Sequence, residues 1–428
     1  MYTAIDLFCG AGGCSEGLIQ AGFNILFSSD ISEMAAKTYI NRHTQLGLIQ
    51  GVNTWFEKAD VRDLTGDFIK AKIASLEIFK NQKIPEIDLM IGGPSCQGFS
   101  RIGKRNKNDP RNMLFGEYVR LIDEIRPKYI VLENVEGFMD MQFMGYKGIT
   151  GISYPDGSLT PDILTNELLE IGYNSLEPKI LNAADYGVPQ NRKRVIFIGY
   201  RKNLSKPNYP QPLNKIIITK EAISDLIDGN IISDYQQECI SGRTKDINGK
   251  TIVSNNYKNT ELPKQANIVR ERFSLFAEGE TVANLRKRIK KEGIDIADKP
   301  ALLAYCSDKL GLCKKIVIEM FKNPKVTDED IDVLLTKKNV RKRLSYGTPS
   351  PTIVTIADDY IHPQKNRTLS VREMARLQSF DDSFEFIGKR TTGGLKRRTE
   401  VPQCTQVGNA VPPLLAKAIA LEISTLLP

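Results

Sequence analysis

Histidine is nearly absent from this chain of 428 residues, which holds only His43 and His362. Chemistry built on a histidine general base is therefore improbable. Cysteine is also sparse: the seven cysteines are scattered, odd in number and without a C-x-x-C pair, which argues against a disulfide framework or a zinc cluster. We expect no metal site, and proton transfers that rest on carboxylates, thiols or water.

Long apolar segments are missing as well. No apolar run approaches the roughly 20 residues that span a bilayer. Residues 1–3 lead straight into a strand-like segment without the basic region of a signal peptide. We therefore expect a soluble, cytoplasmic protein with no membrane partner. With 41% hydrophobic and 26% charged residues the composition is that of a globular protein, and about 150 residues per domain predicts two or three domains.

Charge is divided unevenly along the chain. Residues 1–200 hold 21 Lys and Arg against 24 Asp and Glu, whereas residues 201–428 hold 38 against 27. The net charges of the two parts are thus −3 and +11. Positive charge gathered in one half favours a polyanionic partner, with an ordinary solvated surface as the alternative.

The first 200 residues alternate short apolar runs with segments of helical period, which predicts an α/β fold with a mostly parallel sheet. The expected strands are 4–8, 25–28, 87–91, 129–132 and 195–200, and the expected helices are 15–21, 33–42, 113–125 and 161–171. From residue 201 onward the pattern changes. A proline-rich linker leads into Asn-, Lys- and Gly-rich sequence, a basic helical stretch over 266–292 and an apolar helix over 412–426.

A glycine-rich turn, Gly10 to Gly13, follows the first expected strand and precedes a helix. Glycines there allow a ligand to approach the backbone closely. Ser15 stands where the dinucleotide pattern G-x-G-x-x-G requires its third glycine, so an uncharged or cationic nucleoside fits better than a pyrophosphate. Asp30 follows the next strand at the usual place for a ribose-binding carboxylate, and Asp60 suits an adenine amino group. A plain tight turn with a helix-capping Asp30 is the alternative.

In the segment from Gly92 to Ser100, two glycines, Pro94 and Cys96 follow the carboxyl end of an apolar strand. Open α/β sheets bind their ligands at that end of their strands. Most lone cysteines are inert and buried. Here the glycines and the proline can hold the Cys96 sulfur exposed in a defined direction. A thiol also needs no strong base to act as a nucleophile, which suits a chain almost without histidine.

A carboxylate and two guanidinium groups accompany this loop. Glu133 ends the strand that starts at residue 129, and it emerges beside Cys96 if the two strands are neighbours. Arg192 and Arg194 are two apart on an expected strand and so point to one face. Taken singly, Glu133 can be a solvated strand end, and the two arginines an ordinary basic edge.

In this order the motifs resemble those of the cytosine-C5 DNA methyltransferase family over nearly the whole chain, except its variable middle. The matching stretches are 6–18, Asp30, 92–100, 133–135, 190–194, 367–380 and 406–413. The nucleophile loop departs from many relatives, with Ser95 where they have a second proline. Residues 391–403, including Lys396, Arg397 and Arg398, form a basic insertion that is either a DNA contact or a surface loop.

The resemblance implies a Rossmann-like S-adenosylmethionine-dependent methyltransferase fold with helices on both faces of the sheet, plus a smaller and less regular target-recognition domain. It implies that S-adenosylmethionine is the cofactor. It also implies a discontinuous catalytic domain, 1–200 plus 402–428, and a target-recognition domain with its framework over 201–401. The residues implied to line the cofactor pocket are Phe8, Gly10, Gly12, Asp30, Asp60, Pro94, Asn409 and Val411.

The implied reaction is methylation of C5 of a specific cytosine in duplex DNA. The Cys96 thiolate would add to C6 of a flipped-out base, Glu133 would quench charge at N3, and Arg194, supported by Arg192, would steady O2. We expect the adjoining basic loop to close over DNA phosphates. The residues expected there are Ser100, Arg101, Lys104 and Arg105, followed by Lys107 and Arg111.

The resemblance suggests a free-standing bacterial modification enzyme that is paired with a restriction endonuclease. One active site per chain needs no second subunit, so we expect a monomer. Three rival functions are kept. An RNA cytosine methyltransferase of the same family would share the catalytic segments, and the long basic middle region argues for duplex DNA instead. The missing third glycine counts against a nicotinamide-dependent oxidoreductase. Retention of Cys96, Glu133 and Arg194 counts against an inactive DNA-binding relative.

Overall fold

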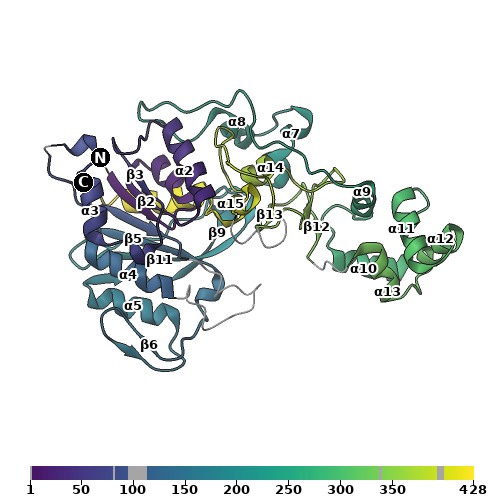
Figure 1. Ribbon diagram of the computed structural model, residues 1–428, viewed down its shortest axis with the longest axis horizontal. Coiled ribbons are helices and arrows are strands. Elements are labelled where there is room, and N and C mark those ends of the chain that lie inside the picture. The colour runs from purple at the N-terminus through teal and green to yellow at the C-terminus, as the bar shows by residue number, and fades with distance from the viewer. Residues whose placement is uncertain (1, 81, 95–112, 337–339, 393–399) are drawn as a thin grey trace.

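A large twisted sheet forms the centre of the protein in the computed structural model, which describes residues 2–80, 82–94, 113–336, 340–392 and 400–428 (Figure 1). The eight strands lie in the order β3-β2-β1-β4-β5-β11-β8, with β9 paired to β11. They are β1 (Tyr2–Leu7), β2 (Phe23–Ser29), β3 (Trp55–Glu57), β4 (Leu89–Gly92), β5 (Tyr129–Asn134), β8 (Tyr173–Ser175), β9 (Lys179–Asn182) and β11 (Lys193–Arg201).

The first five strands of that order are parallel, whereas β11 runs antiparallel to β5, β8 and β9. The predicted α/β fold with a mostly parallel sheet is confirmed. β1 pairs with β2 on one side and with β4 on the other. The loops that follow β1 and β4 leave the sheet where the strand order reverses, and such a switch point opens a crevice at the carboxyl ends of the strands.

Helices cover both faces of the sheet, which explains why its strands read as nearly continuous apolar runs. One face packs against α3 (Gly66–Ala74), α4 (Leu114–Ile125) and α5 (Thr160–Glu170). The other packs against α1 (Gly13–Gln20) and α16 (Pro413–Ser424). Along β1 the side chains alternate between the two cores, because Ala4 joins the second and Ile5 the first.

The last helix of the chain packs against the first, although the two lie at opposite ends of the sequence. Two glycines on α1 allow this approach. A Cβ at Gly13 would stand 2.1 Å from the carbonyl oxygen of Val411, and one at Gly17 would stand 2.5 Å from that of Pro413. The carboxyl-terminal segment around residues 411–413 is therefore fitted directly against α1.

Residues beyond 201 build two further cores. The first is shared by α6 (Thr219–Ile223), α7 (Asp225–Asp228), α8 (Asp234–Ser241), α14 (Val371–Leu377) and α15 (Gln403–Asn409). The second is shared by α9 (Asn267–Ser274), α10 (Val282–Glu292), α11 (Pro300–Leu310), α12 (Lys314–Lys322) and α13 (Asp328–Leu335), here called the helical lobe. Figure 1 shows this lobe at the end of the molecule opposite the large sheet.

The expected basic helical stretch over 266–292 is divided in the structure, because a turn with Gly279 at a φ of +76° separates α9 from α10. Further elements are the 13-residue helix α2 (Glu33–Gln45) and the two-residue strands β6 (Tyr146–Lys147), β7 (Ser153–Tyr154), β10 (Gln190–Asn191), β12 (Lys342–Arg343), β13 (Ser350–Pro351) and β14 (Tyr360–Ile361). Within the described ranges, no helix is long and apolar enough to cross a membrane.

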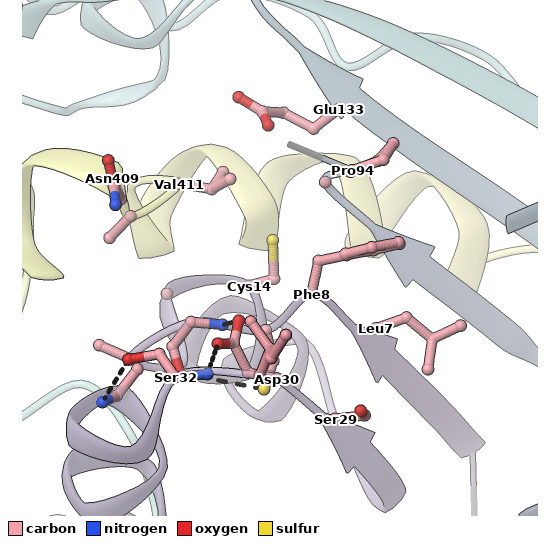
Figure 2. A pocket seen from close by; sticks show the side chains of 18 of the residues that line it. Leu7, Phe8, Cys14, Ser29, Asp30, Ser32, Pro94, Glu133, Asn409 and Val411 are labelled. Atoms are coloured by element: carbon pink, nitrogen blue, oxygen red, sulfur yellow. Dashed lines mark hydrogen bonds between the residues drawn. The ribbon is translucent and has the colours of Figure 1, made fainter. Parts of the chain in front are cut away.

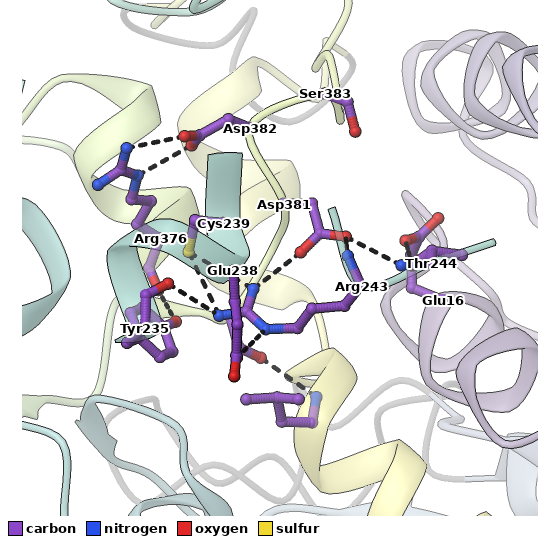
Figure 3. A network of polar contacts seen from close by, with 12 residues as sticks. Glu16, Tyr235, Glu238, Cys239, Arg243, Thr244, Arg376, Asp381, Asp382 and Ser383 are labelled. Carbon is purple, nitrogen blue, oxygen red and sulfur yellow. Dashed lines mark hydrogen bonds and ion pairs between the residues drawn. The ribbon is translucent and has the colours of Figure 1, made fainter. Parts of the chain in front are cut away.

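A buried polar network ties the first 45 residues to the later chain (Figure 3). Arg42 pairs with Glu16 at 2.7 Å, and the Thr244 hydroxyl donates to the same carboxylate. Asp381 accepts from the backbone N–H of Thr244 at 3.2 Å and pairs with Arg243 at 2.8 Å. Buried charges that are this completely paired fix the docking of the segments that carry them.

Candidate functional site

A cavity of about 530 Å³ lies at the carboxyl ends of β1, β2, β4 and β5 (Figure 2). Its walls contain ten of the residues expected from the sequence to act there: Phe8, Gly10, Asp30, Asp60, Pro94, Glu133, Arg192, Arg194, Asn409 and Val411. Gly12 is not among the lining residues, because its Cβ position faces the ring of Tyr39 at 3.0 Å. Segments from both ends of the chain thus meet around one space.

The turn after β1 holds an unusual backbone conformation. Phe8, Gly10 and Gly12 have φ values of +57°, +54° and +101°. A non-glycine residue in this region costs on the order of 1 kcal/mol, and such costs concentrate at ligand-binding sites. A Cβ at Gly10 would have no neighbour within 4 Å, so the backbone there faces open space. A ligand can therefore lie directly against the turn.

Two carboxylates flank the turn. Asp30 accepts the backbone N–H groups of Gly10 at 2.9 Å and Ser32 at 2.8 Å. Burial raises the pKa of Asp30, and these hydrogen bonds oppose the rise. The side-chain hydrogen bond from Arg62 lowers the pKa of Asp60, whose carboxylate pairs with that arginine at 2.5 Å. The cavity is thus bordered by fixed acids, as a cationic or hydroxyl-bearing ligand requires.

A third acid, Asp6, lies buried beneath the turn, and sequence reasoning assigned it no role. The Ser15 hydroxyl donates to Asp6 at 2.6 Å and lies 2.7 Å from the Tyr39 hydroxyl. Burial raises the pKa of Asp6 to about 7, and the nearby charge of Asp30 adds to the rise. The sequence feature that could have identified this contact is Ser15, which occupies the third-glycine position of the dinucleotide pattern. In the structure its hydroxyl donates the hydrogen bond to Asp6.

Glu133 and Arg194 form an ion pair at the far wall of the cavity. Arg194 Nε lies 2.7 Å from Glu133 Oε1, and the side chains are only 12% and 13% exposed. β4 and β5 are neighbours, as the predicted proximity of Glu133 to the nucleophile loop requires. A Cβ at Gly93 would stand 3.1 Å from Glu133 Oε2. The second carboxylate oxygen therefore has room beside Gly93 because that residue lacks a side chain.

Asn134, the residue after Glu133, holds the start of the nucleophile loop. Its buried side-chain amide donates to the carbonyl of Pro94 at 3.1 Å. Cys96, Ser100, Arg101, Lys104 and Arg105, like Lys107 and Arg111, lie outside the described residues. The structure thus fixes the root of this loop, two residues before Cys96, by a contact that the sequence motif did not reveal.

Arg192 and Arg194 both line the cavity, but Arg192 lies between β10 and β11 instead of on a shared strand. Arg192 is 2% exposed and donates to the carbonyl of Ile353 at 3.2 Å. The amide of Gln190 donates to Gln378 Oε1 at 2.8 Å, and Gln378 in turn donates to the Val407 carbonyl at 2.7 Å. This amide relay was missed because its members are far apart in sequence.

The described residues contain no group of three or more His, Cys, Asp or Glu side chains that could hold a metal ion. The described residues place carboxylates, guanidinium groups, the thiols of Cys9 and Cys14 and the exposed backbone of the turn at the cavity. One end of the cavity presents acids and glycines, and the other presents the Glu133 and Arg194 pair. This arrangement can hold two reactants that face each other.

The family model described as C-5 cytosine-specific DNA methylase matches residues 2–425. The chain is 31% identical to the type II methyltransferase M.DdeI of Desulfomicrobium norvegicum, over 98% of this chain and 88% of that protein. It is 28% identical to the type II methyltransferase M.AgeI of Thalassovita gelatinovora, over 98% of each.

Two solved structures share the fold. A prophage-encoded E. coli protein, described as a DNA modification methyltransferase, superposes with a TM-score of 0.65 at 24% identity, covering 100% of this chain and 99% of that one. The Entamoeba histolytica methyltransferase EhMeth superposes with a TM-score of 0.53 at 13% identity, covering 99% and 98%. At sequence identities this low, the structural similarity supports a shared fold and nothing further.

Proposed function

The chain belongs to the C-5 cytosine-specific DNA methylase family, and from this premise we propose that it methylates C5 of one cytosine within a specific sequence of duplex DNA. We propose S-adenosylmethionine as the methyl donor and a covalent bond between Cys96 and C6 of a flipped-out base as the intermediate. The single observation that carries the proposal is the common cavity that joins the acid-flanked turn after β1 to the Glu133 and Arg194 pair.

The cavity suits the cofactor. Asp30, held by two backbone N–H groups, is available to ribose hydroxyls, while Phe8 and Val411 offer apolar walls. The fixed carboxylates favour a sulfonium cation over a pyrophosphate, since no cluster of unpaired cations lies among the described residues of the turn. When bound, S-adenosylmethionine supplies an electrophilic methyl group.

The opposite wall suits a cytosine. C5 is a poor nucleophile until a sulfur–carbon bond from the Cys96 thiolate to C6 moves an electron pair of the C5–C6 double bond toward C5 and N3. Glu133 provides the proton that neutralises N3, and its Oε2 has space beside Gly93. Arg194 fixes Glu133 through Oε1 and presents donors for O2 of the base. Once C5 carries the methyl group, N3 returns its proton to Glu133, and loss of the C5 proton to a base restores the C5–C6 double bond and expels the Cys96 thiolate.

These atoms are inaccessible within a stacked duplex, so the target base must be flipped out at a cost of a few kcal/mol. We propose that residues 201–401 recognise the DNA and that residues 1–200 with 402–428 perform the chemistry. The named relatives are type II methyltransferases, which supports a role as the modification enzyme beside a restriction endonuclease. We further propose that the chain acts as a monomer in the cytoplasm.

The first test is covalent trapping. Genomic 5-methylcytosine mapping in cells that express the chain identifies the target sequence, and a duplex with 5-fluorocytosine at that position then serves as the probe. We expect a complex that survives denaturing gels, needs S-adenosylmethionine, and is lost in Cys96→Ala. An adduct of equal yield with Cys96→Ala would refute the role of Cys96, and methylation of RNA but not duplex DNA would refute the proposed substrate.

A further inference from the structure

The helical lobe contains a pair of helices joined by a very short turn. α11 ends at Leu310, residues 311–313 form the turn, and α12 begins at Lys314. Gly311 adopts a φ of +66°, which ends α11 sharply. Across the turn the Leu312 N–H donates to the Ser307 carbonyl at 3.2 Å, and the Ser307 hydroxyl donates to the Leu312 carbonyl. Two packed helices with a glycine-containing turn of three residues have the pattern of a helix-turn-helix.

The packing of the lobe holds α12 with one face inward and one face outward. Cys306 on α11 and Val317 and Phe321 on α12 are fully buried in the lobe core, which α10 and α13 complete. Lys314, Lys315, Ile316 and Glu319 are exposed, with Ile316 at 52%. In Figure 1, α11 and α12 lie at the extremity of the lobe, away from the large sheet. The outward face of α12 is therefore presented to solvent by a rigid support.

The positive charges at the amino end of α12 are unfavourable for a helix. The first turn of α12 carries two lysines and no acid, although the amino end of a helix dipole disfavours positive charge. Neither lysine has an ion-pair partner among the described residues. Charges that are unfavourable at their place in a helix, and that no ion pair within the protein offsets, tend to mark functional surfaces.

The neighbouring basic helix shows the contrast. On α10, Arg286 pairs with Asp332, Arg288 pairs with Glu280 at 2.9 Å, and Lys290 pairs with Asp328 at 2.6 Å. The positive charge of α10 is thus largely neutralised within the lobe. Exposed Lys309 on α11 and exposed Lys325 after α12 add to the lysines of this surface, which also carries the exposed acids Asp308 and Glu319. Asp328 and Asp332 of α13 instead face Arg286 of α10.

We propose that α11 and α12 form a DNA-binding helix-turn-helix, with α12 lying in the major groove of duplex DNA. In this motif the amino-terminal residues of the second helix meet base edges. Lys314 and Lys315 reach guanine O6 and N7 or the adjacent phosphates, and the exposed Ile316 side chain contacts thymine methyl groups. Because α12 lies at the extremity of the lobe, away from the sheet whose strand ends line the cavity, α12 contacts base pairs other than the modified cytosine. This inference rests on the proposed recognition of DNA by residues 201–401 and names the element that would perform it.

The experiment uses the full chain and a pool of 40-base-pair duplexes whose central positions are random, from which bound duplexes are selected and sequenced. Lys314→Ala/Lys315→Ala is compared with the wild type and with Lys287→Ala/Lys291→Ala, which removes two exposed lysines from α10. Affinity for the best wild-type duplex is measured from 50 to 300 mM salt. Affinity for S-adenosylmethionine reports whether each variant is folded at the cavity.

For the α12 variant we expect the loss of one block of the selected sequence and a salt slope that is lower by about 1.8. At 150 mM salt, two lost phosphate contacts of this kind correspond to roughly 10- to 30-fold weaker binding. The α10 variant should retain the selected sequence and most of the affinity. Unchanged selection and affinity in the α12 variant, or an equal loss in both variants, would overturn the proposal. A chain that selects DNA through α12 but never methylates it would instead refute the proposed function and leave this inference standing.

Discussion

Asp6 gives the most direct quantitative prediction, because it is a buried acid without a cationic partner in the described structure. Its pKa rises from 3.8 to about 7, mainly through burial. The folded state therefore binds the proton more tightly than the unfolded state does. The stability that results is fully present below about pH 4 and is lost as the pH rises through 7.

The expected size follows from the two pKa values. One pKa unit corresponds to about 1.36 kcal/mol, so protonation of Asp6 contributes up to about 4 kcal/mol at low pH. Between pH 5 and pH 8 the wild type should lose about 2.5 kcal/mol of unfolding free energy from this one group. Asp6→Asn keeps an acceptor for the Ser15 hydroxyl but cannot ionise, so it should not lose this amount.

Trp55 provides the assay, because it is the single tryptophan and lies in β3, within the same sheet as Asp6. Urea unfolding followed by its fluorescence at pH 5 and pH 8 gives a difference for each protein. His43 and His362 have pKa values that burial lowers to about 3 and about 4. They therefore lower the unfolding free energy as the pH falls below 6.5, whereas Asp6 raises it. They are common to both proteins and cancel when the wild type is compared with Asp6→Asn.

Cofactor binding provides an independent readout, since a sulfonium cation favours ionised Asp6. The neighbouring thiols of Cys9 and Cys14 have pKa values raised well above 9.0 and stay neutral in this range. The affinity of the wild type for S-adenosylmethionine should therefore increase from pH 6 to pH 8, more steeply than that of Asp6→Asn. Asp156→Asn, in an exposed turn, serves as the control. Equal pH dependence of both stability and affinity in the wild type and Asp6→Asn would refute the reasoning.

Three further predictions concern the cavity and its support. Glu133→Gln should lower turnover by about 10² to 10⁴ while the Kd for S-adenosylmethionine changes less than threefold; unchanged turnover would remove the acid role. Asn134→Ala loses the 3.1 Å contact with the Pro94 carbonyl and should lower kcat about tenfold without changing cofactor affinity, which single-turnover kinetics will test. Gly17→Ala should destabilise the fold by about 1–3 kcal/mol despite better helix propensity, because its Cβ would stand 2.5 Å from the Pro413 carbonyl; an unchanged urea midpoint would contradict this.

The sequence predicted the central strands because each is a short apolar run that ends in a recognisable turn. β1, β4 and β5 lie within a few residues of the expected ranges, and differences of one or two residues at their ends reflect capping and pairing that local pattern does not encode. It also indicated that Glu133 emerges at the same sheet edge as the nucleophile loop. That required only that β4 and β5 be neighbours, as parallel strands joined by one helix commonly are.

Contacts between distant segments could not be predicted in the same way. Gln378 is 188 residues from Gln190, and no spacing rule relates the two amides. Tyr39 reaches Ser15 from a different helix. The boundary between α9 and α10 was missed because charged residues continue across the turn, so hydrophobic periodicity gave no break. These features depend on how distant segments pack in the folded chain, and local sequence patterns do not reveal such packing.

The charge asymmetry of the sequence changes meaning once burial is known. Part of the +11 of residues 201–428 belongs to buried arginines that stabilise the fold: Arg343 donates to the carbonyls of Phe273 and Phe276, and Arg376 pairs with Asp382 at 2.7 Å. A guanidinium group has five donors in a rigid fork and can satisfy several buried acceptors, whereas a lysine ammonium cannot. The exposed cations of α12 are lysines. Replacing a buried arginine therefore tests stability and replacing an exposed lysine tests DNA affinity, so the two classes must be analysed separately when the DNA-binding surface is mapped.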